Sequence, residues 1–369
     1  MPAVNSSEHK ITLRLPAGSY DILVRPGLLA DVGNWLAGQS RTKKAAVVSD
    51  SNVLPLHGKA VCDSLRAVGI EPIVATIPAG EDHKSLADML PVYDAILGAK
   101  IERSTPVLAL GGGVVGDIAG FVAATVLRGV PFVQIPTTLL AMVDASVGGK
   151  TGVNHKTGKN LIGAFHQPIG VLIDPLTLKT LPASELRGGL AECIKHDIIR
   201  DANGFAELEN NITKALAVDV EYLSSLIAHN VAIKARVVEA DPLEHGERAH
   251  LNFGHTFGHA VETVSGHSYS HGESVALGMT AACFLAAKLG MFDETARQRV
   301  VSVIERAGLP ARGLTLSTEQ VVNAMAFDKK VATGRVRFVL PTEIGKVVIR
   351  DDVPREMVTA AVESLKNAV

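Results

Sequence analysis

The sequence is poor in cysteine, carries almost no excess of either charge and has no long apolar run. Its three cysteines, Cys62, Cys193 and Cys283, are scattered and odd in number, which argues against a disulfide framework and fits a reducing cytoplasm. The 36 basic and 38 acidic residues form no basic block or acidic tail, so neither nucleic acid nor a membrane is expected as a partner. The longest uncharged stretches, such as residues 129–143, contain prolines and are too short to span a membrane.

The composition is that of a globular protein of the cytoplasm. The opening residues, MPAVNSSEHK, lack the apolar segment of a secretory signal peptide. Hydrophobic residues make up 47% of the chain and charged residues 20%, a balance that can bury a large core. With 369 residues the chain has room for two domains of ordinary size.

The first half of the chain alternates between short apolar runs and stretches of helical periodicity. We expect a strand in each of five runs, which are KAAVVSD, EPIVATI, TPVLALGGG, PFVQIPTT and GVLIDP. Helical stretches such as residues 54–69 and 85–100 lie between them. This repetition predicts a parallel sheet with helices on both faces. In such sheets ligands bind beyond the carboxyl ends of the strands.

The pattern changes after Pro182, where most segments carry helical periodicity. Residues 184–202, 219–241, 248–262 and 272–290 are examples, and only residues 335–350 resemble a late hairpin. We therefore expect an α/β domain over residues 1–183 and a mainly α-helical domain over residues 184–369.

A glycine-rich turn follows the third expected strand, in LALGGGVVGDIAGFVAA. Gly111, Gly113 and Gly116 satisfy G-x-G-x-x-G, a pattern that lets the backbone approach a pyrophosphate at a helix N-terminus. Alone the pattern is a weak signal, and a tight strand-to-helix turn is an equal alternative. The ribose-binding acid is missing from its usual place. Asp50, followed by Asn52, ends an earlier strand and could replace it if the two strands are neighbours.

Two glycine-rich segments that carry lysines follow, DASVGGKTG and TGKN. The first fails the P-loop pattern, because Asp144 stands where that loop needs a glycine. Lys150 is then either a contact to phosphate or carboxylate or an ordinary surface lysine. Lys159 and Asn160 repeat the same chemistry nearby, which favours an anion site over a solvated turn.

A stripe of polar residues runs along the expected helix RAHLNFGHTFGHAVE. On a helical wheel, Asn252, His255, His259 and Glu262 all fall within about 40° of Arg248, and the other faces are apolar or small. Such a helix is buried, and its polar stripe needs partners. The histidine spacing matches H-E-x-x-H, but a threonine replaces the glutamate that a zinc protease needs. The alternatives are a solvated face or core histidines with ordinary partners.

Two other segments supply further metal-binding side chains. His271 stands at an expected helix start, where the helix dipole favours a neutral, ligating imidazole. Glu192, Lys195 and His196 share one face of another helix. One glutamate and two histidines form a catalytic zinc set. Spacing alone does not decide which two histidines bind, and Glu192–Lys195 could be an ordinary helical ion pair.

Taken together, these segments resemble the 3-dehydroquinate synthase family of the sugar-phosphate cyclase superfamily. The matching motifs run from GSYDILVRPGLL through PAGEDHK, GGGVVGD, PTTLLAMVDASVGGKTGVNHKTGKNLIGAF, AECIKH, HLNFGHTFGHAVE, SHGESVALGM and DKK. The resemblance implies a Rossmann-like NAD-binding domain, a helical metal-binding domain, an active site in the cleft between them and a homodimer. The cofactors would be NAD and a divalent metal, zinc or cobalt.

The resemblance also assigns roles to individual residues. The metal ligands would be Glu192, His255 and His271, whereas His259 would meet the substrate phosphate. The NAD contacts would be Asp50, Asn52, Glu81, Lys84, Gly112, Gly113, Val114, Val115, Gly116, Asp117, Thr137, Thr138, Lys150, Lys159, Thr177, Leu178, Lys179, Thr180, Leu181 and Glu185. The substrate contacts would be Lys150, Asn160, Lys195, Lys234, Arg248, Asn252, His259 and one lysine of DKK, Lys330 rather than Lys329, with Arg128 reaching across the dimer. The catalytic residues would be Asp144, Lys150, Asn160, Lys195, Glu244, Asn252 and His259.

The resemblance implies conversion of 3-deoxy-D-arabino-heptulosonate 7-phosphate to 3-dehydroquinate and phosphate, with NAD oxidised and regenerated within each turnover. Lys234, Arg248 and Asn252 offer charge and hydrogen bonds to the substrate carboxylate. Cyclases whose substrates lack that carboxylate tend to carry an acid near RAHLN. The alternatives are another such cyclase, a metal-dependent polyol dehydrogenase of the same fold, which would accumulate NADH, and a regulator without turnover.

Overall fold

The computed structural model describes residues 8–366 except 17, 243–245, 267 and 326–335. The chain forms two compact units. The first consists of Met1–Pro182 and Val220–Glu239, and the second of Ala183–Asp219 and Ala240–Val369. This division differs from the expected one in a single helix, because residues 220–239 pack with the first unit.

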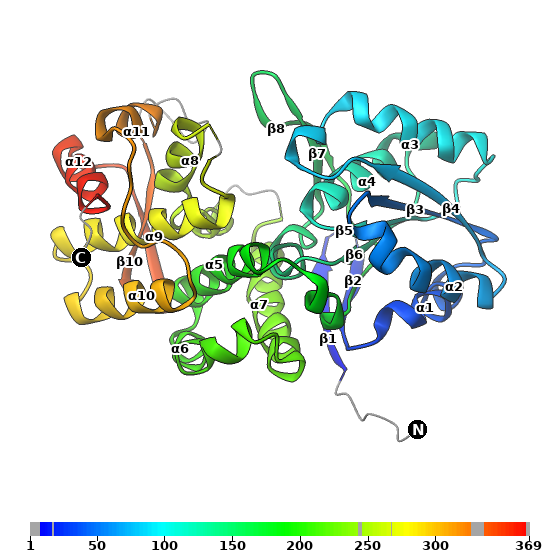
Figure 1. Cartoon of the computed structure of the whole chain (residues 1–369), viewed down its shortest axis with the longest axis horizontal. Coiled ribbons are helices and arrows are strands. Elements are labelled where there is room, and N and C mark those ends of the chain that lie inside the picture. Colours follow the sequence, from blue (N-terminus) through cyan, green and yellow to red (C-terminus); the bar gives the residue numbers. More distant parts are fainter. Residues whose placement is uncertain (1–7, 17, 243–245, 267, 326–335, 367–369) are drawn as a thin grey trace. The chain divides into compact units, whose positions relative to one another are not determined.

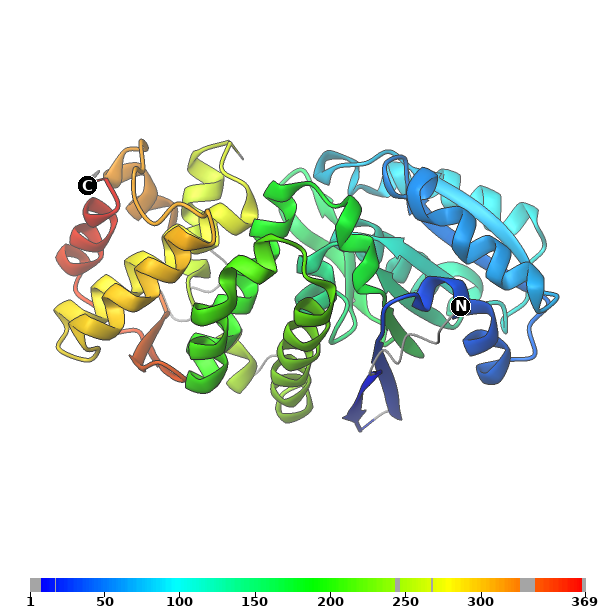
Figure 2. The same cartoon turned by 60° about the horizontal axis from the view of Figure 1, so that its bottom comes forward.

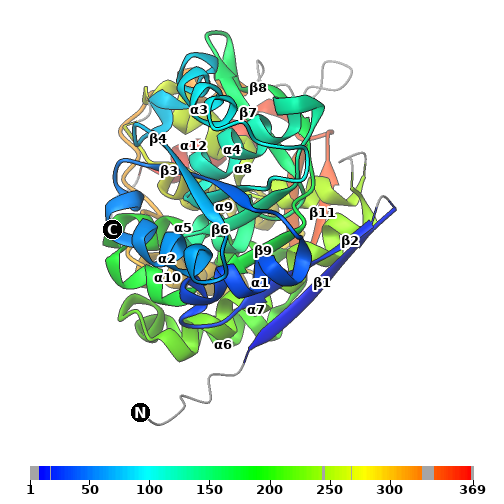
Figure 3. The same ribbon diagram turned by 90° about the vertical axis from the view of Figure 1, so that its right-hand side faces the viewer.

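The first unit is built on a seven-stranded sheet, with strand order β1-β2-β9-β6-β5-β3-β4 (Figure 1). The strands are β1 (His9–Leu15), β2 (Gly18–Val24), β3 (Lys44–Asp50), β4 (Glu71–Ile77), β5 (Val107–Gly111), β6 (Phe132–Pro136) and β9 (Gly170–Ile173). All neighbours pair in parallel except β1 and β2, which form an antiparallel hairpin along one edge (Figure 3). All five expected strands are confirmed. A separate hairpin of β7 (Lys150–His155) and β8 (Gly158–Phe165) was not expected.

Helices cover both faces of this sheet, as expected. Strand β3 shows why, because Ala46 and Val48 enter one core with residues of α3 and α4, while Ala45 and Val47 enter another with residues of α1 and α2. The helices are α1 (Val32–Gln39), α2 (Lys59–Ala67), α3 (Leu86–Gly98), α4 (Gly113–Thr125) and α7 (Val220–Ala240). Short helical turns are η1 (Leu28–Asp31), η2 (Leu54–Gly58), η3 (Glu81–His83), η4 (Val126–Arg128), η5 (Ala141–Ala145) and η6 (Pro175–Thr180).

Helix α7 is tied to the edge hairpin of the first unit. The backbone N–H of Arg14 in β1 donates a hydrogen bond of 2.6 Å to Oε1 of Glu239. Helical periodicity predicts that residues 220–240 form a helix, but it does not show which unit the helix joins. That depends on contacts such as this one, whose two residues are 225 positions apart in the sequence.

The second unit is mainly helical and is organised around α9, which contacts α5, α8, α10, α12 and β10 (Figures 1 and 2). Its helices are α5 (Ala183–Arg200), α6 (Ala202–Leu216), α8 (His255–Val264), α9 (His271–Lys288), α10 (Glu294–Arg306), α11 (Thr318–Met325) and α12 (Arg355–Ser364), with the short turn η7 (Glu247–Asn252). The expected late hairpin is confirmed as β10 (Phe338–Glu343) and β11 (Lys346–Arg350).

The single helix expected over residues 248–262 was wrong. Residues 247–252 form the 3-10 turn η7, and the chain breaks at Phe253 and Gly254 before α8 begins at His255. Gly254 has a φ of 76°, a left-handed value that glycine adopts at little cost and that no α-helix contains. The helical wheel drawn from Arg248 through Glu262 therefore describes the structure only from His255 onward, within α8.

None of the helices in the described part of the chain has the length and apolar character that crossing a membrane requires.

Candidate functional site

Helix α5 meets the start of α9 through two glycines. A Cβ on Gly272 would lie 2.3 Å from the Cα of Gly188, which is far inside van der Waals contact. The side chain of Ser270 accepts a hydrogen bond from the Glu273 N–H, and the Glu273 carboxylate accepts one from the Ser270 N–H, so a capping box fixes the helix start at His271. The close crossing brings Glu192 of α5 opposite His271 of α9.

Helices α8 and α9 also cross at glycines. A Cβ on Gly278 would lie 1.9 Å from the carbonyl oxygen of Gly254, and one on Gly258 would lie 2.8 Å from that of Ser274. Glycine is the residue that permits such close backbone approach. This packing places the first residue of α8, His255, beside the first residue of α9.

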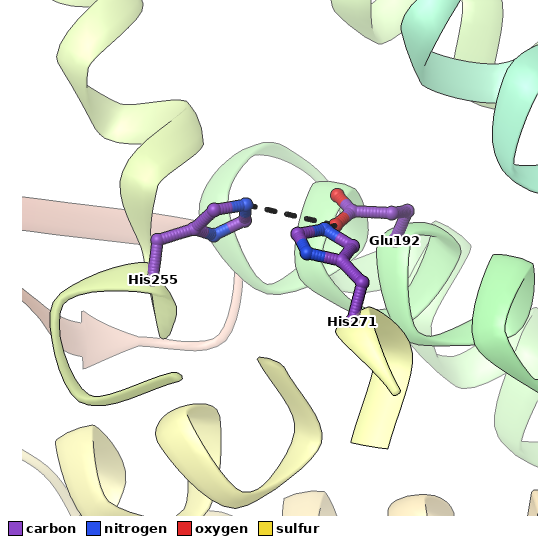
Figure 4. Close-up of side chains that lie close together, drawn as sticks. All are labelled: Glu192, His255 and His271. Carbon is purple, nitrogen blue, oxygen red and sulfur yellow. Dashed lines mark ion pairs between the residues drawn. The ribbon is translucent and has the colours of Figure 1, made fainter. Parts of the chain in front are cut away.

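Glu192, His255 and His271 form the centre of the site in the second unit (Figure 4). One ligand atom from each lies within 4.8 Å of the others. Oε1 of Glu192 is 3.8 Å from Nε2 of His255 and 3.4 Å from Nε2 of His271. The Glu192 side chain is fully buried, and the imidazoles keep 11% and 35% exposure, so one side of the group stays open.

The second nitrogen of each imidazole faces its own acceptor. Nδ1 of His255 is 3.1 Å from the carbonyl oxygen of Phe253, and Nδ1 of His271 is 3.7 Å from Oε2 of Glu262. Metal-binding histidines commonly use one nitrogen for the metal and the other for such an acceptor. One carboxylate oxygen and two Nε2 atoms are the donors that Zn²⁺ and Co²⁺ accept, so these residues fit a divalent metal.

The two imidazoles differ in their proton affinity without metal. Burial and the nearby Lys195 ammonium hold the pKa of His255 well below its usual range. Burial also lowers the pKa of His271, but Glu192 and Glu262 outweigh it and raise that pKa to about 9. The expectation that the helix start keeps His271 neutral was therefore wrong for the metal-free protein, because two carboxylates face this ring.

A second grouping shares one of these histidines. His259, Glu262 and His271 also lie within 4.8 Å of one another through one ligand atom each, and the His259 ring is 5.2 Å from the His255 ring. His259 lies one turn after His255 on α8, so both rings face the same region, as the spacing predicted. His271 is common to both groups, and His259 lies beside the group of Glu192, His255 and His271.

Three other expected residues of the second unit are Lys195, which contacts this centre, and Arg248 and Asn252 of η7. Lys195 forms an ion pair with Glu192, and both side chains are buried. The Arg248 side chain is buried and its Nη1 donates to the Pro242 carbonyl at 2.8 Å. Asn252 ends η7, one residue before the break, and is partly buried. Expected residues Glu244, Lys329 and Lys330 lie outside the described residues.

The first unit carries the glycine loop at the carboxyl end of β5. Strands β3 and β5 are neighbours, so Asp50 lies at the same edge of the sheet as the loop, which was the condition set for its role. Oδ1 of Asp50 accepts hydrogen bonds from the N–H groups of Asn52 and Val53 at 2.8 and 2.9 Å. The carboxylate is thus fixed by its own turn.

The glycines of the loop are required by what lies against them. A Cβ on Gly116 would lie 2.8 Å from Oε1 of Gln134 in β6, and one on Gly112 would lie 3.1 Å from the Thr138 side chain. The hydroxyl of Thr137 is buried and has no hydrogen-bond partner among the described residues. A bare backbone at the start of α4 and an unsatisfied hydroxyl beside it fit the pyrophosphate of a dinucleotide.

A buried lysine joins the loop to the β7–β8 hairpin. Nζ of Lys84 donates to Oδ2 of Asp117 and to Oδ1 of Asn160, both at 2.5 Å. Burial raises the pKa of Asp117, and the Lys84 ammonium opposes that rise. Lys84 therefore connects the helix after the glycine loop with the hairpin that carries Lys150 and Lys159.

The other expected residues of the first unit fall into two places. The Lys234 ammonium of α7 bonds both the carbonyl and the carboxylate of Asp144 in η5. In η6, Oγ1 of Thr180 is 2.9 Å from Nε2 of His57, a residue of η2. Thr177 and Leu178 are buried, whereas Arg128 and Lys179 are exposed, as is Glu185 of α5 in the second unit. Arg128 has a left-handed φ of 68° and lies at the end of η4.

Two residues that shape these clusters were missed as candidates in the sequence. Glu262 was counted in the polar stripe but given no partner, and its proximity to His271 depends on the crossing of α8 and α9. Asn154 was not singled out, and its contacts to Glu81 and Asn160 depend on an irregularity in the hairpin.

The comparison with known proteins covers both units. A family model described as 3-dehydroquinate synthase N-terminal matches residues 74–188, and one described as 3-dehydroquinate synthase C-terminal matches residues 189–331. A curated 3-dehydroquinate synthase of Microcystis aeruginosa is 49% identical over 351 residues, which are 94% of this chain and 96% of that protein.

Solved structures with the same architecture are also similar over nearly their full length. The 2-epi-5-epi-valiolone synthase of Streptomyces hygroscopicus subsp. jinggangensis, with NAD⁺ and Zn²⁺ bound, is 33% identical with a TM-score of 0.85, over 94% of this chain and 96% of that one. A 2-deoxy-scyllo-inosose synthase, solved with carbaglucose-6-phosphate, NAD⁺ and Co²⁺, shares the fold at a TM-score of 0.88 and 22% identity, over 96% and 99% of the two chains. The chain belongs to the 3-dehydroquinate synthase family.

Proposed function

We propose that the protein is a 3-dehydroquinate synthase. It converts 3-deoxy-D-arabino-heptulosonate 7-phosphate to 3-dehydroquinate and phosphate, as a phosphate-eliminating carbon–oxygen lyase of the shikimate pathway to aromatic amino acids. The observation that carries the proposal is the group of Glu192, His255 and His271, found in a chain 49% identical to a curated 3-dehydroquinate synthase over 94% of its length.

NAD and a divalent metal serve as cofactors. Gly112–Asp117, Thr137 and Asp50 would hold NAD, and Glu192, His255 and His271 would hold the metal. When bound, the metal supplies Lewis acidity at substrate hydroxyls, and NAD accepts a hydride and returns it within the same turnover. A related structure with NAD⁺ and Zn²⁺ bound supports this pair of cofactors.

The chain's own side chains bind and orient a dianionic substrate. A phosphate and a carboxylate both need cationic partners, and Lys150, Lys195, Lys234 and Arg248 are the candidates. Buried Lys195 and Arg248 are already fixed by neighbours, so little side-chain entropy is lost when they bind an anion. That the clusters of the two units act on one substrate molecule is part of the proposal.

The choice among cyclases rests on the carboxylate. Arg248 and Asn252 sit next to the break before α8, where members that act on substrates without a carboxylate tend to carry an acid. Replacing Arg248 or Asn252 should therefore weaken binding of the heptulosonate phosphate more than binding of a sugar phosphate that has no carboxylate. The higher identity to 3-dehydroquinate synthases than to the valiolone synthase supports the same choice.

We also propose that the protein is a cytoplasmic homodimer in which Arg128 reaches the partner's substrate. The described residues include exposed apolar side chains on α3 and on the β7–β8 hairpin, namely Leu86, Leu90, Leu97, Leu161 and Phe165. Such residues are usual in interfaces between subunits. The three cysteines are buried and form no disulfide, which supports a reducing compartment.

The decisive experiment supplies the metal-loaded protein with the heptulosonate phosphate and NAD. We expect phosphate and 3-dehydroquinate to form in equal amounts without net NADH. Steady NADH accumulation with glycerol, and no phosphate release, would favour a polyol dehydrogenase instead. Bound NAD and metal with no turnover would favour a regulatory protein.

A further inference from the structure

The pairing of β7 with β8 is irregular at one residue. Val153 pairs with Ile162 and His155 pairs with Gly158, so the register shifts across Asn154. Two steps along β7 therefore oppose four along β8, so the extra residues of the irregularity lie on β8, around Asn160. Asn154 lies opposite this irregular stretch.

Asn154 makes three hydrogen bonds to two separate segments. Its backbone N–H donates to the carbonyl of Lys84 at 2.8 Å, and its Nδ2 donates to Oε1 of Glu81 at 2.8 Å. Its Oδ1 accepts from the backbone N–H of Asn160 at 2.9 Å. One residue thus holds the turn that contains η3 and the first residues of β8.

The residue that Asn154 holds has an unusual backbone. Asn160 has a φ of 54°, in the left-handed region, where a non-glycine residue needs support from its surroundings. Its own Oδ1 accepts from Nζ of Lys84, which also bonds Asp117. A ring of hydrogen bonds therefore links the η3 turn to the start of β8, and its members are Glu81, Lys84, Asn154 and Asn160.

We propose that Asn154 is a positioning residue that sets the η3 turn and the start of β8 in one arrangement. This rests on the proposed function, in which Glu81 and Lys84 contact NAD and Asn160 contacts the substrate. Asn154 touches neither ligand in this scheme. It aligns the residues that contact NAD with the residue that contacts the substrate, so its loss weakens the binding of both ligands.

The chemistry requires an amide. One end of the Asn154 side chain donates to a carboxylate, and the other accepts from a backbone N–H. An aspartate would keep the acceptor for Asn160 but would set two carboxylates against each other at Glu81. An alanine would remove both bonds.

The test compares N154A and N154D with N34A. Asn34 is the matched control, because it is an exposed asparagine of the same unit whose Nδ2 donates to Oδ1 of Asp31 at 2.8 Å. We expect N154A to weaken NAD binding, measured by calorimetry, by about tenfold and to raise KM by a similar factor. N154D should weaken NAD binding without a comparable loss at the hairpin, and N34A should change neither.

Hydrogen–deuterium exchange separates this proposal from the proposed function. In N154A, exchange should rise in both segments, around residues 80–85 and around residues 154–161, and this needs neither substrate nor turnover. A rise confined to the hairpin, or unchanged NAD affinity and KM in a folded N154A, would overturn the positioning role. If N154A does not fold, N154D carries the test alone, because protection lost at 80–85 but kept at the Asn160 N–H is its specific signature.

A last variant examines whether Asn154 and Glu81 act together. The double variant N154A/E81A should bind NAD no more weakly than E81A alone, because the two residues act as one unit. Additive losses would contradict the proposal. An inactive wild type that still shows this coupling and the exchange pattern would refute the proposed function and leave the positioning role intact.

Discussion

Nδ1 of His271 lies 3.7 Å from Oε2 of Glu262, while Nε2 of the same ring lies 3.4 Å from Oε1 of Glu192. The ring is therefore held between two carboxylates, one on each nitrogen. A carboxylate on the far nitrogen of a metal-binding imidazole fixes the ring and increases its basicity.

Glu262→Ala should weaken binding of Zn²⁺ or Co²⁺ by about 10- to 100-fold, because the ring loses the acceptor that orients it. Competition with a chromophoric chelator measures this without any turnover. Glu305→Ala, at an exposed glutamate of α10, is the control and should keep wild-type affinity. Unchanged affinity in Glu262→Ala would show that the contact plays no part in metal binding.

His255→Ala and His259→Ala should separate a ligand from a neighbour on the same helix. His255→Ala removes one of three proposed ligands and should abolish stoichiometric metal binding. His259→Ala should keep the metal and lose rate, since that residue is proposed to meet the substrate phosphate. Metal content by atomic absorption and kcat are the two measurements. Metal lost in His259→Ala but kept in His255→Ala would favour the alternative group of His259, Glu262 and His271, and equal loss in both variants would refute the division of roles.

Lys84→Met should destabilise the protein in a pH-dependent way. Burial raises the pKa of Asp117 above its ordinary 3.8, and Lys84 opposes this. A carboxyl with a raised native pKa contributes most to stability at pH below its unfolded value, and this contribution is lost as pH rises through the native pKa. Without Lys84 that pKa rises further. The ionised Asp117 carboxylate then lowers the free energy of unfolding most at neutral pH.

Near pH 7 we expect Lys84→Met to lower the free energy of unfolding by roughly 1 to 3 kcal/mol. This is less than the loss expected on breaking a fully buried ion pair, because the Asp117 side chain keeps 20% exposure. Urea unfolding from about pH 8 to about pH 5 should show the loss shrinking as pH falls. The double variant Lys84→Met/Asp117→Asn should lose this pH dependence. A loss that is constant with pH would mean that Asp117 is not the group responsible.

Much of the first unit could be predicted because four of its strands, β3, β5, β6 and β9, are buried on both faces. Strands β3 and β5 are continuous apolar runs, and that is the pattern a parallel strand must have. Strands β7 and β8 carry glycine, lysine and asparagine instead, residues that are depleted in strands, so no pattern marked the hairpin. Lys84, Asp117 and Asn160 were therefore predicted one by one from the resemblance but not as a cluster, and Asn154 was missed.

The metal group was predictable in its residue types but not in its membership. Spacing placed His255 and His259 on one face, and this held because α8 spans both. The break at Gly254 was missed because one glycine in a helical pattern does not reveal a left-handed φ. Which histidines face Glu192 depends on how α5, α8 and α9 cross, and that is a property of tertiary packing.

Gly272→Ala should disturb the metal site from a distance, and Gly188→Ala provides its control. The Cβ of Gly272→Ala would lie 2.3 Å from the Cα of Gly188, backbone that cannot move without separating α5 from α9. The Cβ of Gly188→Ala would meet the Cα of Gly272 at 4.0 Å, an ordinary contact, although both changes occur at the same crossing.

We expect Gly272→Ala to lower the free energy of unfolding by about 1 to 3 kcal/mol, as overpacking does, and Gly188→Ala to change it by less. Since the crossing sets Glu192 opposite His271, metal affinity should fall in Gly272→Ala and stay near wild type in Gly188→Ala. Equal metal affinity in the two variants would mean that the glycine crossing does not position the ligands.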